Sequence, residues 1–134
     1  MPKPDARPPR ILIVDDDPSV AKVLESMVRR LGYDVRVAGR PDDAIKLLDD
    51  SIDAMLIDLR LPDMRGDAFY YLATTRYPAL SHRTILMTGD ISEQAEDAVL
   101  ATGCPLLRKP FGGKALSALL AQVIPFIPSN SEAS

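Results

Sequence analysis

Residues 54–66 have the sequence AMLIDLRLPDMRG, in which a short apolar run ends at Asp58 and a segment containing Pro62 and Gly66 follows. An apolar run that leads into proline and glycine is typical of a buried strand opening into a turn. In a parallel sheet Asp58 would stand at the carboxyl edge, where open α/β sheets bind their ligands. The stretch therefore predicts a functional carboxylate at position 58.

The same strand pattern recurs along the chain, with helical patterns between its occurrences. We predict strands over residues 11–14, 34–38, 54–58, 84–87 and 105–107, and helices over about 18–31, 41–50, 67–77, 93–102 and 116–123. This alternation favours an α/β fold in which helices cover both faces of a parallel sheet. Right-handed crossovers then place every strand-to-helix loop on one edge of the sheet.

Composition limits the classes of protein to consider. The chain has 134 residues, 46% hydrophobic and 26% charged, with a net charge of -3, which is typical of one globular domain without a nucleic-acid-binding surface. Cys104 is the single cysteine, so an internal disulfide is excluded and a reducing cytoplasm is the expected compartment. The first apolar run, residues 11–14, is too short for a signal peptide or a membrane span.

Polar side chains follow four of the predicted strands. Asp15 and Asp16 come after the first, Asp58 ends the third, Thr88 follows the fourth and Lys109 follows the fifth. Carboxylates about 4 Å apart repel each other by about 4 kcal/mol at an effective dielectric constant near 20, so positive charge is expected beside them. Oxygen ligands without histidine or thiolate favour Mg²⁺, and Lys109 adds a second cation. Such a site can admit a phosphoryl group, with Asp58 as a carboxylate nucleophile and Thr88 as a hydrogen-bond donor.

Four motifs in this order resemble the receiver domain of bacterial two-component response regulators. They are Ile11–Asp16, Asp58 with Pro62 and Gly66 behind it, Met87–Gly89 and Lys109–Phe111. The resemblance covers about residues 9–127 and leaves 1–8 and 128–134 as expected flexible tails. It implies a flavodoxin-like, doubly wound sheet of five parallel strands in the order 2-1-3-4-5, surrounded by five helices.

The resemblance also implies roles for individual residues. Asp58 is the expected phosphoacceptor, Asp15 and Asp16 bind Mg²⁺ with it, and the backbone carbonyl of Arg60 is a further metal ligand. Thr88 and Lys109 are expected to contact the phosphoryl group, and the Lys109–Pro110 peptide bond is expected to be cis. No turnover enzyme is implied beyond Mg²⁺-dependent self-phosphorylation from a phosphodonor and self-dephosphorylation.

Partners follow from the same resemblance. A sensor histidine kinase or a histidine phosphotransfer protein is the expected phosphodonor. A downstream protein, or a second copy in a homodimer, is expected to recognise the surface of the fourth helix, fifth strand and fifth helix. Residues 125–134 are too few for a DNA-binding or catalytic domain, so the sequence predicts output through protein contacts or onward phosphorelay.

Two positions depart from the usual receiver pattern. The switch position three residues before the lysine is Leu106, where receivers usually carry tyrosine or phenylalanine, and leucine there resembles receivers attached to hybrid sensor kinases. Arg60 and Asp90 each lie two residues after a site residue, and we hypothesise that they form a lid pair that slows attack by water on the phosphorylated aspartate.

Three other interpretations remain open at this stage. A flavodoxin-like flavin carrier would offer hydroxyl and backbone N–H groups to a phosphate, whereas the first loop here offers three carboxylates. An aspartate-dependent phosphohydrolase would carry a second aspartate where this chain has Arg60. A receiver-like interaction module that is never phosphorylated is the remaining alternative.

Overall fold

The computed structural model describes residues 7–89 and 93–124, which form strands and helices in alternation. The strands are β1 Arg10–Val14, β2 Asp34–Ala38, β3 Ala54–Asp58, β4 Thr84–Thr88 and β5 Leu106–Arg108. The helices are α1 Pro18–Arg30, α2 Pro41–Leu47, α3 Gly66–Arg76, α4 Glu93–Thr102 and α5 Gly113–Val123, with a 3-10 helix, η1, over Pro78–His82. None of the helices in the described part of the chain has both the length and the apolar composition needed to cross a membrane.

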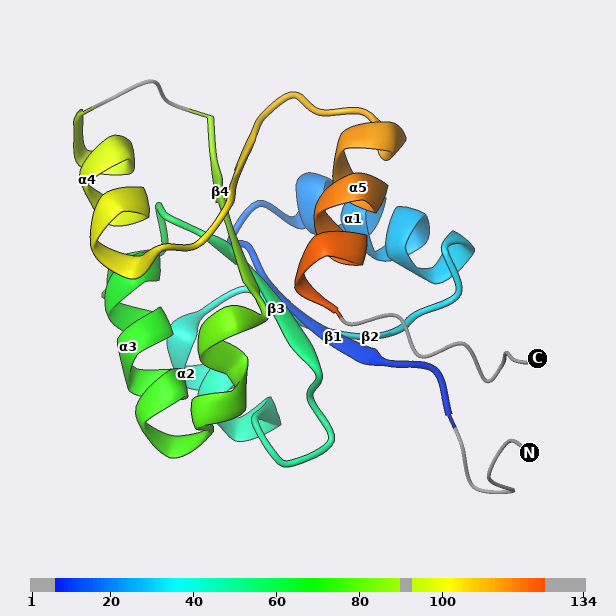
Figure 1. Cartoon of the computed structure of the whole chain (residues 1–134), viewed down its shortest axis with the longest axis horizontal. Coiled ribbons are helices and arrows are strands. Elements are labelled where there is room, and N and C mark those ends of the chain that lie inside the picture. The colour runs from blue at the N-terminus through cyan, green and yellow to red at the C-terminus, as the bar shows by residue number, and fades with distance from the viewer. Residues whose placement is uncertain (1–6, 90–92, 125–134) are drawn as a thin grey trace.

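The predicted sheet is confirmed. All four strand pairs are parallel, and the strand order is β2-β1-β3-β4-β5, so β3 is central (Figure 1). Every residue of β3 is buried because strands flank it on both sides and helices cover both faces. Asp58 pairs in register with Met87. The phosphoacceptor predicted from sequence therefore lies beside the carboxyl end of β4.

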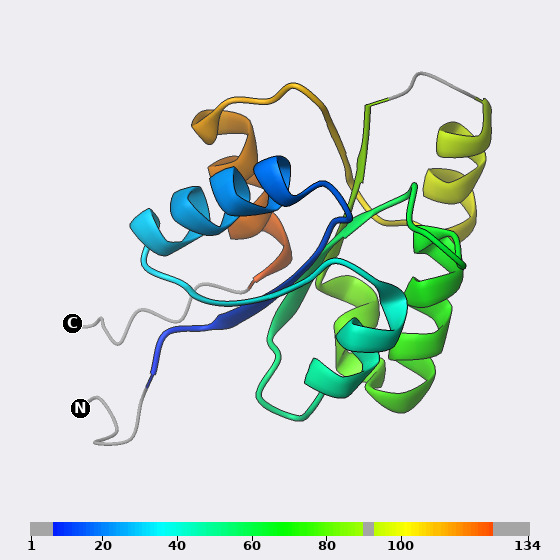
Figure 2. The same ribbon diagram turned by 180° about the vertical axis from the view of Figure 1, so that it is seen from behind.

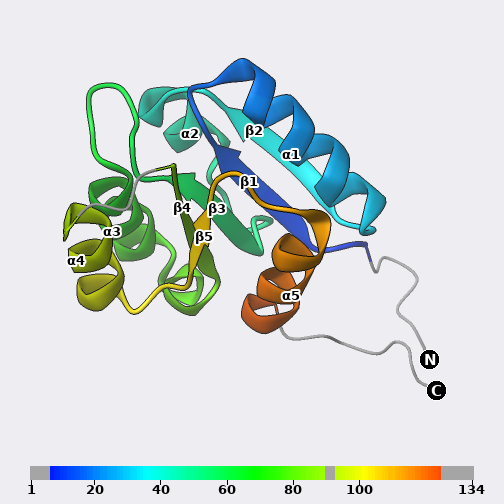
Figure 3. The ribbon, with the colours of Figure 1, turned by 90° about the horizontal axis from the view of Figure 1, so that it is seen from above.

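The helices form two layers on the sheet. Helices α1 and α5 cover one face, and α2, α3 and α4 cover the other, as the views from behind and from above show (Figures 2 and 3). Side chains of a strand alternate between the faces. In β1, Ile11 and Ile13 join the core beneath α1 and α5, while Leu12 and Val14 join the core beneath α2 and α3.

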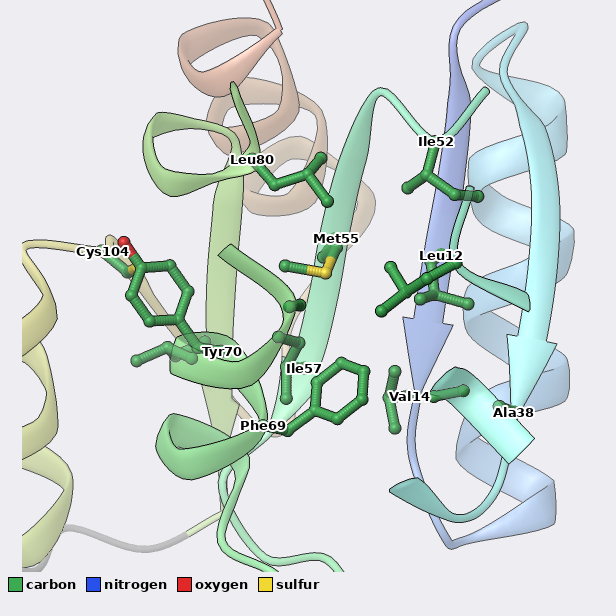
Figure 4. Close-up of a cluster of buried hydrophobic side chains, with 14 of the residues drawn as sticks. Leu12, Val14, Ala38, Ile52, Met55, Ile57, Phe69, Tyr70, Leu80 and Cys104 are labelled. Carbon is green, nitrogen blue, oxygen red and sulfur yellow. The ribbon is translucent and has the colours of Figure 1, made fainter. Parts of the chain in front are cut away.

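Phe69 of α3 is a central side chain of the second core. Its ring is completely buried and points toward Val14 and Ile57 of the sheet (Figure 4). Farther along the same cluster, Tyr70 lies beside Cys104 and its hydroxyl donates to the carbonyl of Ser81 at 2.8 Å. Helix α3 is therefore held both by apolar burial and by a hydrogen bond to η1.

Helix boundaries are mostly where capping residues predict them. The Asp17 side chain accepts hydrogen bonds from the first turn of α1. Gly32 ends that helix with a φ of 97°, and Gly103 ends α4 with a φ of 74°. Both angles are in the left-handed region that glycine adopts without steric cost.

Two local expectations were wrong. Helix α2 ends at Leu47 instead of about Asp50, because the Asp49 carboxylate accepts from the Ser51 amide at 2.8 Å and forms a local turn that competes with helix. The segment before β4 forms η1, where we predicted no helix.

We expect Phe69→Ala to lower the free energy of unfolding by about 3–5 kcal/mol, because it removes a fully buried ring and leaves a cavity. Leu100→Ala on α4 is the control, since that side chain is 82% exposed and its truncation should change stability by no more than about 0.5 kcal/mol. Urea unfolding followed by circular dichroism measures both. Equal losses in the two variants would contradict the assigned core.

Candidate functional site

The carboxyl edge of the sheet brings the predicted site residues to one place. Asp15 and Asp16 follow β1, Asp58 is the last residue of β3, Thr88 is the last residue of β4, and Lys109 follows β5. Each is delivered by the end of a strand whose register is fixed by its neighbours. The site is therefore assembled by sheet topology from segments far apart in the sequence.

Three carboxylates lie close together in this site. One oxygen from each of Asp15, Asp16 and Asp58 lies within 4.8 Å of the others. Asp15 and Asp58 are buried, whereas Asp16 is exposed. At such separations each ionised pair repels by roughly 3–4 kcal/mol at an effective dielectric constant near 20. The cluster therefore requires positive charge.

Lys109 supplies part of that charge. Its Nζ donates to Asp15 Oδ2 at 2.9 Å and to Asp58 Oδ2 at 2.7 Å. The Lys109 side chain is 20% exposed, so the two ion pairs are largely shielded from solvent. One ammonium bridges two buried carboxylates and leaves an excess of negative charge once Asp16 is included.

Backbone amides hold the second oxygen of each buried carboxylate. The Asp17 amide donates to Asp15 Oδ1 at 3.0 Å, and the Arg60 amide donates to Asp58 Oδ1 at 2.9 Å. These bonds fix the orientation of both carboxyl groups before any ligand arrives. Such preorganisation is favourable for a group that must meet a reacting atom in one geometry.

The pKa shifts reflect the same contacts. Burial raises the pKa of Asp15 above its ordinary value, against the opposing effect of its hydrogen bonds to Lys109 and to the Asp17 amide. Burial alone would lower the pKa of Lys109, but its hydrogen bonds to Asp58 and Asp15 outweigh this effect and raise the pKa. The lysine is therefore a permanent cation at neutral pH.

The donor set fits a hard divalent cation. Asp15, Asp16 and Asp58 offer carboxylate oxygens and no nitrogen or sulfur ligand, the chemistry that Mg²⁺ prefers. A dication would neutralise the charge that Lys109 leaves uncompensated. An open hollow of about 390 Å³ adjoins Asp15 and Asp16 between α1 and β2, so the exposed side of the cluster is accessible.

The remaining predicted residues surround this cluster. Thr88 is 5% exposed and its carbonyl accepts from the Lys109 amide at 2.7 Å, which ties the ends of β4 and β5 together. The Lys109–Pro110 peptide bond is cis, the isomer expected from the resemblance. Leu106 pairs with Leu86 in the sheet and is half-buried against the core beneath α2 and α3. Asp90 lies outside the described residues, so the lid pair with Arg60 stays a prediction.

Gly66 has a structural role that its sequence position did not disclose. A Cβ atom at this position would lie 2.2 Å from the carbonyl oxygen of Asp58. The Gly66 amide also donates to the Leu59 carbonyl at 3.0 Å and closes the loop that leaves β3. The glycine is predicted from sequence only as a turn residue, because its close approach to Asp58 depends on how α3 packs against the end of β3.

Comparison with known proteins identifies the family that shares this arrangement. The family model described as the response regulator receiver domain matches residues 11–121. Transcriptional regulatory protein CpxR of Escherichia coli strain K12 is 32% identical over 118 residues, which cover 86% of this chain and 49% of CpxR. The uncharacterized transcriptional regulatory protein YrkP of Bacillus subtilis strain 168 is 31% identical over 117 residues, covering 85% of this chain and 49% of YrkP. The chain thus spans about half the length of these relatives.

Solved structures agree in fold. The signal receiver domain of an HD domain-containing protein from Pseudomonas fluorescens Pf-5 superposes with a TM-score of 0.79 at 27% identity, covering 87% of this chain and 94% of that chain. A response regulator protein from Burkholderia pseudomallei, crystallised with a phosphorylated aspartic acid, a calcium ion and citrate, gives a TM-score of 0.73 at 25% identity. It covers 87% of this chain and 67% of that chain.

We expect Gly66→Ala to destabilise the protein by about 1–3 kcal/mol, because the added methyl group meets backbone that cannot move without displacing Asp58. Gly113→Ala is the matched control. Its added Cβ would meet only the Cε atom of Met27 at 3.6 Å, and alanine is the better helix former by up to about 1 kcal/mol. Chemical denaturation of both variants tests this, and a loss that is no larger at position 66 would disprove the close contact.

We expect Asp15→Asn to raise the free energy of unfolding at pH 7 when no divalent cation is present, because it removes the cost of a buried charge. The raised pKa of Asp15 means that the native state disfavours the ionised carboxylate. As the pH falls through this raised folded value toward the ordinary 3.8, the unsubstituted carboxyl takes up its proton and the difference between the proteins shrinks.

Saturating Mg²⁺ provides the control for this prediction. Because a ligand that binds the native state stabilises it, Mg²⁺ should stabilise the unsubstituted protein more than Asp15→Asn. Thermal unfolding at pH 7 and at a series of lower pH values down to about the ordinary pKa of 3.8, with and without Mg²⁺, measures both effects. A variant that is less stable without metal at pH 7 would contradict the assigned cost of the buried charge.

Proposed function

Because the chain belongs to the family of response regulator receiver domains, we propose that it is a phosphorylation switch in which Asp58 is the phosphoacceptor. The donor is the phosphohistidine of a sensor histidine kinase or of a histidine phosphotransfer protein. The observation that carries the proposal is the placement of Asp58, whose carboxylate is held by the Lys109 ammonium at 2.7 Å and by the Arg60 amide at 2.9 Å. Membership of this family also argues against the flavin-carrier and phosphohydrolase interpretations.

The proposed transfer is an in-line displacement at phosphorus. A lone pair of an Asp58 carboxylate oxygen forms the new bond, while the bond between phosphorus and the donor's imidazole nitrogen breaks and its electron pair stays with the imidazole. Lys109 then hydrogen-bonds the transferred phosphoryl oxygens, and the Thr88 hydroxyl donates another hydrogen bond. Mg²⁺, held by Asp15, Asp16, Asp58 and the Arg60 carbonyl, would supply charge neutralisation for the phosphoryl oxygens. Besides this reaction and hydrolysis of its own acyl phosphate, the domain catalyses no turnover.

The proposed output surface comprises α4, β5 and α5. Helix α4 buries the small side chains Ala95 and Ala98, whereas Leu100 is 82% exposed. Its shallow packing suits an element that moves between two states when the site is phosphorylated. At position 106 receivers usually have an aromatic ring, which can move into the space that the threonine leaves. Leu106 has no such ring, so the proposed signal passes through the half-buried leucine and α4 instead.

Downstream partners are proposals of the same kind. CpxR and YrkP are named as transcriptional regulatory proteins, and this chain aligns with about half of each. We propose that the phosphorylated domain recognises another protein or a second copy of itself through the α4, β5 and α5 surface, or passes the phosphoryl group onward. Cytoplasmic placement agrees with the reduced, buried Cys104.

We expect the protein to gain one phosphoryl group when incubated with Mg²⁺ and a small phosphodonor such as acetyl phosphate, as measured by intact-protein mass spectrometry. The gain should vanish in Asp58→Asn, which removes the nucleophile, and should fall about 10-fold or more in Lys109→Ala, which removes transition-state charge stabilisation. Removal of Mg²⁺ with a chelator should abolish it.

Asp42→Asn is the matched control, because it removes an exposed carboxylate in the first turn of α2. That variant should be phosphorylated like the unsubstituted protein. Phosphorylation that persists in Asp58→Asn would contradict the assignment of Asp58 as the phosphoacceptor. An absence of phosphorylation from any donor, phosphohistidine included, would favour the alternative of a receiver-like interaction module.

A further inference from the structure

The loop that leaves β3 contains a strained turn. Asp63 has a φ of 69°, the single positive value among the described residues other than glycine. The Met64 amide donates to the Pro62 carbonyl at 2.8 Å, so Asp63 is the central residue of a γ-turn of the rare, positive-φ kind. A residue other than glycine occupies such a conformation only where its surroundings hold it there.

Arg40 makes an ion pair with Asp63 and contributes to that hold. Its guanidinium forms an ion pair with the Asp63 carboxylate, and it is the residue that precedes α2. The two residues are 23 positions apart, and the loop between β3 and α3 reaches toward the start of α2 in the view from above (Figure 3). The ion pair therefore ties the strained turn to the neighbouring strand-to-helix connection.

The tied loop also carries the backbone of the candidate site. Arg60 lies between Asp58 and Asp63, its amide donates to Asp58, and the loop closes where the Gly66 amide meets the Leu59 carbonyl. Asp63 lies three residues after Arg60, so the turn and the peptide group of Arg60 belong to the same short loop.

We propose that Arg40 and Asp63 are positioning residues for the metal site, holding the loop after β3 so that the Arg60 carbonyl is presented to a divalent cation. This inference rests on the proposed function, since it concerns the Mg²⁺ of that function. Neither residue touches the reacting atoms. Their ion pair acts through the loop geometry alone.

If only long-range electrostatics mattered, removal of the ion pair would leave the affinity for Mg²⁺ unchanged. Removal of the ion pair by Arg40→Gln together with Asp63→Asn leaves the net charge unchanged, so long-range attraction of Mg²⁺ is nearly the same. Asparagine also tolerates positive φ, so the backbone at position 63 remains accessible to its native conformation. Any loss of metal affinity in this double variant is therefore caused by the loss of the ion pair between the two loops.

The experiment is a calorimetric titration of the full chain with Mg²⁺, with no phosphodonor. We expect the double variant to bind Mg²⁺ about 2- to 5-fold more weakly, the range that corresponds to the worth of an exposed ion pair. The single variant Arg40→Lys preserves the ion pair and should retain most of the affinity of the unsubstituted protein. The matched control is Arg36→Gln with Asp49→Asn, which removes an exposed ion pair between β2 and the loop before β3 and should leave Mg²⁺ affinity unchanged.

Amide hydrogen exchange without metal provides a second readout. The Met64 and Gly66 amides should exchange about 2- to 5-fold faster in the double variant, while amides within β3 should not change. Unchanged Mg²⁺ affinity and unchanged exchange would overturn the inference and leave the proposed function intact. If the unsubstituted protein binds no Mg²⁺, the metal site of the proposed function is wrong, and the inference is overturned with it.

Discussion

The ammonium of Lys109 between Asp15 and Asp58 is the contact on which the site depends. Two buried carboxylates at the end of a parallel sheet repel each other, and burial penalises the charge of each. Lys109 bonds to both, at 2.9 and 2.7 Å, and so makes their coexistence possible. The negative charge that remains, with Asp16 included, suits the binding of a dication.

The fold provides the rigidity that this contact requires. β3 is buried along its whole length, and its register with β1 and β4 places Asp58 at the carboxyl edge. Two apolar cores hold the sheet from opposite faces, one beneath α1 and α5 and one beneath α2, α3 and α4. Because strand ends in a well-packed sheet cannot shift independently, the separation of the charged groups is set by the cores.

Outside the sheet the molecule is less uniformly held. Helix α4 contacts the rest through small buried side chains and leaves Leu100 exposed, whereas α3 buries Phe69 and hydrogen-bonds η1 through Tyr70. The loop after β3 is held less firmly than α3 and more firmly than α4. It is strained at Asp63, whose carboxylate forms an ion pair with Arg40. A rigid site next to less tightly packed elements is the arrangement expected of a domain that converts a local change of charge into a change of surface.

The sequence by itself determined the alternation of strands and helices and the strand ends that carry Asp58 and Lys109, because apolar periodicity and capping residues are local properties of the chain. Its four motifs, in their order, indicated the family. Only the tertiary structure decided which groups touch. The contact of Lys109 with both carboxylates, the approach of Gly66 to the Asp58 carbonyl and the ion pair between Arg40 and Asp63 join residues that no local pattern connects. Such contacts follow from how the elements pack, since a distance across the fold is set by the sum of many side-chain volumes rather than by the residues that meet there.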